Sequence, residues 1–200
     1  MRLRLILVVL AAFGIGAVAA LGALTYDQTS GGRDVVATGK PLVGGPFTLT
    51  DHTGKRVTEK DFQGRHMLVF FGFTYCPDVC PAELQVITSA LDTLGKQASQ
   101  VTPVFITVDP ERDTVEQMAA YIKHFHKSFI GLTGTADEIR AAAKAYRVYY
   151  AKVKDESSSA GYTFDHSSIV FLMDKQGEYA AHFPPGTGPE KMAEGIRKRL

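Results

Sequence analysis

The chain lacks the features of a nucleic-acid-binding protein. It contains no tryptophan, and its 22 basic residues are nearly balanced by 21 acidic ones, for a formal net charge of +1. Proteins that bind nucleic acid usually carry a basic patch or stripe, so we expect no nucleic-acid partner. A chain of 200 residues with ordinary globular composition allows one domain of about 150–180 residues and a short additional segment.

The first 24 residues are almost devoid of charge. Arg2 and Arg4 precede an uncharged apolar run, residues 5–24, which is long enough to cross a bilayer as a helix. Positive charge before the run favours an N-terminus in the cytoplasm and a body outside it. Small residues in the run also fit a signal-peptidase site, so it is either a retained anchor, which its length favours, or a cleaved signal segment. Both predict a location on the periplasmic side of a bacterial inner membrane.

Beyond residue 24 the sequence predicts a linker and one domain. Residues 25–44 are rich in glycine, threonine and charge and have weak periodicity, which is typical of a linker. In residues 45–200, continuous or alternating apolar residues predict strands, and a period near 3.6 predicts helices. The predicted strands cover residues 47–49, 55–57, 67–73, 101–108, 129–132, 148–153, 162–164, 168–173 and 179–183, and the predicted helices cover residues 81–97, 114–125, 136–146 and 189–199.

The order of these elements predicts an α/β fold. Strands alternate with helices, then a hairpin and a last helix follow, which implies a mixed sheet flanked by helices on both faces. The order resembles the thioredoxin fold, with an additional N-terminal β-hairpin and an insertion before the last hairpin. Thr135 is expected to cap the helix that follows it. Pro81 fits a first helical turn, and Glu83 is expected at the positive end of the same helix.

The two cysteines lie between a predicted buried strand and a helix. Cys76 and Cys80 belong to the sequence GFTYCPDVCP, residues 72–81. A disulfide between them would close almost no loop and would stabilise little, so redox or metal chemistry explains them better than a structural role. Ligands of open α/β sheets bind at the carboxyl ends of strands, and a helix N-terminus lowers thiol pKa values. In a helical turn both sulfurs would lie on one side, facing one ion or each other.

His166 is the candidate for a third ligand, because two thiolates rarely complete a metal site. It immediately precedes the apolar strand 168–173. In a thioredoxin-like fold the loop that enters this strand packs over the Cys motif. Thioredoxins place a cis-proline there, whereas this chain has His166. Thiolate and imidazole donors both suit copper. The other histidines are interpreted as ordinary residues of turns, helix ends and strands: His52, His66, His124, His126 and His182.

Several motifs resemble those of the Sco/SenC family of copper-binding assembly factors for cytochrome c oxidase. The resemblance covers roughly residues 43–185. It is carried by GPF at 45–47, DFQG at 61–64, FGFTYCPDVCP at 71–81, VDPERDT at 108–114 and DHS at 165–167. The Cys motif in its strand–helix setting is the most specific of these. Val115 is a departure, because many members have Pro after the Thr, but it lies away from the metal site.

The resemblance implies one copper ion, Cu(I) or Cu(II), held by Cys76, Cys80 and His166. It implies an extracytoplasmic copper chaperone that delivers copper to the dinuclear copper site of cytochrome c oxidase. The expected partner is the apo copper-binding subunit of the oxidase, together with another periplasmic copper carrier or a thiol reductase. The alternative is a thiol-disulfide oxidoreductase, in which Cys76 and Cys80 are a redox-active pair that keeps the oxidase cysteines reduced. A metallochaperone is favoured over an enzyme.

Other functions fit the residues less well. Thioredoxin-type oxidoreductases need Cys-x-x-Cys and the cis-proline, and this chain has neither. Peroxiredoxins need Thr or Ser and a Pro at positions where it has Phe73 and Val69. A structural zinc module needs a closed four-ligand set. Among nearby carboxylates, Asp165 is expected to orient the adjacent imidazole, whereas Asp109 and Asp113 are interpreted as structural or partner-facing.

Overall fold

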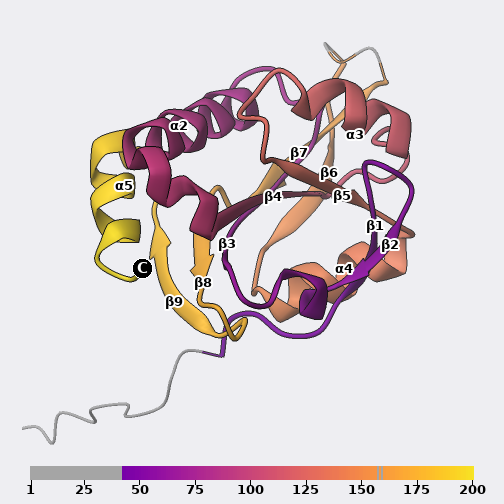
Figure 1. Ribbon diagram of the computed structural model, residues 1–200. Helices are drawn as coiled ribbons and strands as arrows, with labels where there is room; N and C mark the ends of the chain where they lie inside the picture. Colours follow the sequence, from indigo (N-terminus) through magenta and orange to yellow (C-terminus); the bar gives the residue numbers. More distant parts are fainter. Residues whose placement is uncertain (1–41, 157, 159) are drawn as a thin grey trace, which may run out of the picture. The chain divides into compact units, whose positions relative to one another are not determined.

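Figure 1 shows the arrangement of helices and strands in a computed structural model of the chain. The structure describes residues 42–156, 158 and 160–200, which belong to one compact unit, Lys40–Leu200. The predicted anchor or signal segment, residues 1–24, and most of the predicted linker, residues 25–44, lie outside the described residues. Within the described part, no helix is both long and apolar enough to span a membrane.

A seven-stranded mixed sheet forms the centre of the domain (Figure 1), with the strand order β2-β1-β5-β4-β3-β8-β9. β3 and β5 run parallel to β4, whereas the outer pairs β1–β2, β1–β5, β3–β8 and β8–β9 are antiparallel. The strands are β1 (Thr48–Asp51), β2 (Arg56–Thr58), β3 (His66–Gly72), β4 (Val101–Thr107), β5 (Ile130–Thr133), β8 (Val170–Met173) and β9 (Tyr179–Phe183).

The two central strands are buried along their whole length. Every residue of β3 and of β4 is buried, as their continuous apolar sequences predict for strands covered on both faces. The parallel register pairs Gly72 with Thr107, so both strands end at the same edge of the sheet. The segments that follow them, with the two cysteines and with VDPERDT, are therefore neighbours in space.

Helices cover both faces of the sheet, which confirms the thioredoxin-like α/β prediction. α2 and α3 lie on one face and α4 on the other, and α5 packs beside α2 (Figure 1). The helices are α2 (Val79–Leu94), α3 (Val115–Ile122), α4 (Ala136–Ala145) and α5 (Pro189–Arg197). Thr135 caps α4 as predicted, since its side chain accepts a hydrogen bond from the Glu138 N–H.

Two short 3-10 helices interrupt the predicted pattern. η1 (Glu59–Phe62) precedes β3, and η2 (Gly95–Gln100) follows α2. The helix predicted over residues 81–97 in fact ends at Leu94. Gly95 has a φ of +58°, a left-handed conformation that glycine adopts at low cost and that ends an α-helix.

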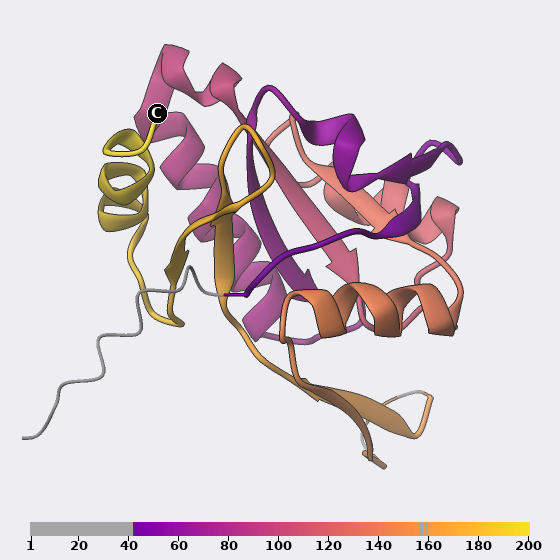
Figure 2. The ribbon, with the colours of Figure 1, turned by 90° about the horizontal axis from the view of Figure 1, so that it is seen from below.

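The predicted insertion is a β-hairpin outside the central sheet. Within the described part of the chain, β6 (Tyr150–Lys154) and β7 (Tyr162–His166) pair only with each other, as a separate two-stranded sheet. Figure 2 shows this hairpin projecting beyond α4 and away from the other strands. One boundary prediction was wrong: His166 is the last residue of β7 rather than part of a loop, because the extended pairing continues to His166 opposite Tyr150.

Gly72, the last residue of β3, packs closely against the side chains beneath the Cys motif. A Cβ atom built on it would lie 2.7 Å from Cys80 Sγ and 2.9 Å from Phe105 Cε2. Real Cβ atoms do not approach other atoms so closely, and protein interiors are packed too densely to yield without strain. The position therefore requires glycine for space.

We expect Gly72→Ala to destabilise the domain by about 1–3 kcal/mol, the usual cost of overpacking a core. Urea denaturation followed by circular dichroism measures the change. Gly188→Ala is the matched control. Its Cβ would meet nothing closer than 3.7 Å, so we expect it to cost less than about 1 kcal/mol, for a poorer N-cap. Equal stability of the two variants would show that the Gly72 site can relax.

Candidate metal centre

The two cysteines lie at the N-terminus of α2, directly after the central strand β3. Cys80 is in the first turn of the helix and is completely buried, whereas Cys76 precedes the helix and is half-buried. Both are free thiols. The Cys80 N–H donates a hydrogen bond to Cys76 Sγ over 3.3 Å. Cys76 lies before α2 rather than in a helical turn with Cys80, so the helical i, i+4 argument does not describe the pair, although the two sulfurs do lie close together as predicted.

His166 reaches the cysteines from the end of β7. Its Nε2 lies 3.3 Å from Cys80 Sγ. Among the described residues, Cys76, Cys80 and His166 form a group that can hold a metal ion, and the ligand atoms all lie within 4.8 Å of one another. The structure therefore brings together all three sequence-predicted ligands from two distant segments.

A backbone carbonyl fixes the ring of His166. Nδ1 lies 3.3 Å from the carbonyl oxygen of Ser167, and this contact fits the tautomer that carries its proton on Nδ1. In the neutral ring Nε2 is then unprotonated and available as a ligand. The expectation that Asp165 orients the ring was wrong. Successive residues of a strand point to opposite faces, and Asp165 is exposed.

Two aromatic rings pack against the imidazole. The His166 ring meets Phe73 edge-on, with a centroid separation of 5.9 Å, and Phe70 with one of 6.1 Å. Both phenylalanines are buried and lie on or just after β3. The imidazole is thus held between the hairpin and the central sheet, with its Nε2 directed at the sulfurs.

The two thiols have opposite pKa shifts. The pKa of Cys76 is lowered to about 4, first by a hydrogen bond from the Cys80 thiol and then by His166 and backbone N–H groups, against the opposing effect of burial. The pKa of Cys80 is raised, because its proton is shared with the Cys76 thiolate, its sulfur is buried and the neighbouring charge repels a second one. The pair therefore holds one proton and one negative charge.

A buried aspartate anchors the loop that carries Cys76. Asp113 is completely buried and accepts hydrogen bonds from the Thr74 N–H (3.0 Å), the Thr74 hydroxyl (2.6 Å) and the Thr107 hydroxyl (2.5 Å). Burial raises its pKa, and these bonds oppose the shift. Asp109 is also buried. Both carboxylates are therefore internal, in agreement with the structural interpretation and not with a partner-facing one.

Sequence reasoning overlooked Thr74 and misplaced Glu83. Thr74 lies two residues before Cys76 and is the link to Asp113, and its only sequence signal is a hydroxyl residue beside the motif. The Glu83 carboxylate does not lie at the positive, N-terminal end of α2, because Glu83 follows the first turn of the helix and is buried. Its Oε1 makes no hydrogen bond to any described residue, and burial raises its pKa.

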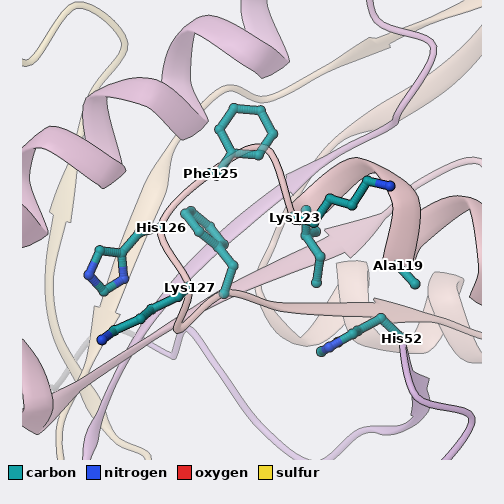
Figure 3. A pocket seen from close by; sticks show the side chains of 8 residues that line it. His52, Ala119, Lys123, Phe125, His126 and Lys127 are labelled. Carbon is teal, nitrogen blue, oxygen red and sulfur yellow. The ribbon is translucent and has the colours of Figure 1, made fainter.

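The remaining histidines lie away from the cysteines. His52 and His126 line a separate pocket with Lys123 and Lys127, formed by the β1–β2 turn, α3 and the segment after α3 (Figure 3). Nδ1 of His52 accepts a hydrogen bond from the Gly131 N–H. These rings have structural partners, as their interpretation as ordinary residues requires.

Comparison with known proteins identifies the family. The family model described as SCO1/SenC matches residues 35–200. The chain belongs to the SCO1/SenC family. The human mitochondrial SCO1 homolog is 48% identical over 165 residues, which cover 81% of this chain and 54% of that protein. The SCO2-like protein RC0895 of Rickettsia conorii is 36% identical over 196 residues, covering 98% and 96%. This SCO1/SenC chain thus spans only about half the length of the human relative.

Several similar structures contain copper. The copper-bound ScoI of Arabidopsis thaliana has a TM-score of 0.75 and 43% identity, with coverage of 78% of this chain and 97% of that one. The copper-bound ScoI of Bradyrhizobium japonicum has a TM-score of 0.72 and 42% identity, with coverage of 79% and 99%. Their similarity extends over the described domain.

We expect alkylation of Cys76 in the reduced, metal-free protein to be nearly independent of pH between pH 5.5 and 8. With a pKa of about 4, the thiolate is already formed throughout this range. An ordinary cysteine, with a pKa near 8.5, would react about tenfold faster for each added pH unit. Iodoacetamide labelling followed by mass spectrometry measures the rate.

Cys76→Ser is the control for this measurement. It leaves only Cys80, which is completely buried, so we expect labelling to fall to near zero. A rate for the unaltered protein that climbs tenfold per unit from pH 6 to 8 would contradict the lowered pKa of Cys76.

Proposed function

We propose that this protein is an extracytoplasmic copper chaperone that binds one copper ion through Cys76 Sγ, Cys80 Sγ and His166 Nε2. The observation that carries the proposal is the approach of these three ligand atoms to within 4.8 Å of one another. Thiolates are soft donors that favour Cu(I), and imidazole also suits Cu(II). The copper found in the plant and bacterial relatives supports the same cargo here.

The protonation state of the site supports a monovalent copper cargo. Metal ligands must be deprotonated, and Cys76 already is. Only the Cys80 proton has to leave. Binding of Cu(I) would therefore exchange one proton for one monovalent ion and leave the charge of the site unchanged. A change in the charge of a buried site is costly, and this exchange avoids it. His166 Nε2 supplies a third donor for Cu(II).

The surroundings of Cys76 support transfer of copper to another protein. Cys76 is half-buried, and the side chains of Tyr75 and Val79 beside it are 48% and 46% exposed. Exposed apolar side chains around a site favour protein–protein contact. The partner we propose is the apo copper-binding subunit of cytochrome c oxidase, whose dinuclear copper site would receive the ion. Another periplasmic copper carrier would supply it.

The proposed location is the periplasmic side of a bacterial inner membrane. It rests on the apolar run of residues 5–24 and the two arginines before it. An extracytoplasmic location suits both a copper carrier and a thiol pair that cycles with a disulfide.

The second candidate function is a thiol-disulfide reductase that keeps oxidase cysteines reduced. The lowered pKa of the half-exposed Cys76 favours it, because a thiolate at the surface is the attacking species in disulfide exchange. Cys80, buried behind it, would then be the resolving thiol. Both functions use the same pair, so only a transfer experiment separates them.

We expect the reduced protein to bind close to one copper per chain and His166→Ala to weaken Cu(II) binding. The loss should exceed the roughly 10–100-fold caused by removing a group that merely supports a ligand, while Cu(I) binding by the two thiolates is less affected. Competition titration, with absorption in the thiolate–copper charge-transfer region, measures both. His124→Ala, an exposed histidine, is the matched control. Unchanged Cu(II) affinity in His166→Ala would exclude His166 as a ligand.

We expect the copper-loaded protein to metallate a reduced, apo fragment of the oxidase copper subunit. In metal analysis of the two proteins after separation, the copper bound to the fragment would rise as the copper bound to the carrier falls. The metal-free dithiol protein, incubated with the oxidised fragment, is the comparison, and Cys76→Ser is inactive in both assays. Reduction of the fragment without any copper transfer would favour the reductase over the chaperone.

A further inference from the structure

The hairpin that carries His166 is not held by the central sheet. Among the residues that the structure describes, β6 and β7 pair only with each other, so the backbone hydrogen bonds that join the other strands into the central sheet do not hold this hairpin. A ligand on such a hairpin needs side-chain contacts to keep its position relative to the cysteines. Those contacts converge on Arg112.

Arg112 links three segments of the chain. Its guanidinium carbon lies 4.1 Å from the ring centroid of Tyr162 on β7, and 4.8 Å and 5.9 Å from the centroids of Tyr75 and Phe73 in the Cys loop. Its Nε donates to the carboxylate of the buried Asp109, which follows β4. The Arg112 side chain is only 13% exposed, so its interactions with the rings are largely shielded from water and strengthened accordingly.

Tyr162 is held at both ends of its side chain. Its hydroxyl donates to Asp109 Oδ1 over 3.2 Å, and the Lys152 ammonium lies 3.9 Å from its ring centroid. Lys152 in turn pairs with Glu111, at 2.7 Å. The ring of Tyr162 is thus fixed to the segment that follows β4 by Arg112, Asp109 and, through Lys152, Glu111.

The position of Tyr162 determines the direction of His166. Residues i, i+2 and i+4 of a strand lie on one face, and on β7 these are Tyr162, Phe164 and His166. All three face the Cys loop: Tyr162 through Arg112, and Phe164 and His166 through edge contacts with Phe73 at centroid separations of 5.7 Å and 5.9 Å. Holding Tyr162 in place therefore keeps this face of β7, with the His166 imidazole, directed at the Cys loop.

We propose that Arg112, through its stack on Tyr162, is a positioning residue that holds His166 against the two cysteines. Arg112 contacts Asp109 and the rings of Tyr162 and the Cys loop rather than the three ligand atoms, so it acts through the hairpin. Loss of the stack frees β6–β7 from the Cys loop and withdraws the imidazole, while the sulfurs remain in place. The consequence for copper rests on the proposed function, whereas the consequence for the hairpin does not.

The first test is hydrogen exchange of the full chain, metal-free and reduced, in detergent micelles. Arg112→Gln removes the guanidinium, and Tyr162→Leu removes the ring while leaving the Arg112–Asp109 pair intact, so one variant remains informative if the other folds poorly. We expect amides of β6 and β7 to exchange at least fivefold faster in both, with β3 unchanged. Tyr162→Phe, which keeps the ring and loses only the hydroxyl bond to Asp109, should lie between the unaltered protein and Tyr162→Leu.

Arg140→Gln is the matched control, because Arg140 forms an exposed pair with Asp137 on α4, away from the site. Two results would overturn the proposal: unchanged exchange of the hairpin in Arg112→Gln and Tyr162→Leu, or equal acceleration of β3 and the hairpin. The second result would mean that Arg112 stabilises the domain as a whole.

The second test is copper binding in a double-mutant cycle. We expect Arg112→Gln and Tyr162→Leu to weaken Cu(II) at least fivefold in the unaltered background, to change Cu(I) by less than twofold, and to have no effect when His166 is already Ala. Equal losses with and without His166 would overturn the positioning role. If the unaltered protein binds no copper, the proposed function fails, and the hydrogen-exchange result alone decides the role of Arg112.

Discussion

The burial of the Cys80 sulfur beneath His166 is the constraint on which the site depends. Gly72 provides the space for that sulfur, and Nε2 of His166 lies 3.3 Å from it. Ionisation of a thiol in this position is unfavourable, so the charge of the pair resides on Cys76. Glycine at residue 72, the depth of Cys80 and the reactivity of Cys76 are thus consequences of one packing arrangement.

The parallel register of β3 and β4 assembles the rest of the site. Because Gly72 lies opposite Thr107, the Cys loop and the segment after β4 leave the sheet together. Asp113 then accepts two hydrogen bonds from Thr74 and one from Thr107, which orders the backbone just before Cys76. The charged run VDPERDT therefore supports the cysteines from within the protein, and its carboxylates Asp109 and Asp113 are buried.

The sequence alone predicts those parts that depend on local patterns. Continuous apolar runs identify β3 and β4, a cap identifies α4, and the spacing of Cys76 and Cys80 identifies a site at a strand–helix junction. The position of His166 before a core strand of a thioredoxin-like fold, together with the family resemblance, identifies the third ligand. Features that depend on distant packing could not be predicted: the stacking of Arg112 on Tyr162, the burial of Glu83, and the carbonyl that takes the place expected for Asp165. Each results from where an element lies in space, which residue types do not specify.

The separation of the hairpin from the central sheet also bears on how the chain tolerates change. His166 lies at the base of β7, opposite Tyr150, whereas the turn joins Lys154 to Tyr162 at the other end. Tyr162 and His166 are four residue steps apart along the strand, or about 14 Å. An insertion, deletion or attached probe in that turn leaves the register at the base intact. The length of this turn can therefore differ among proteins with this architecture while the distance from imidazole to sulfur remains the same.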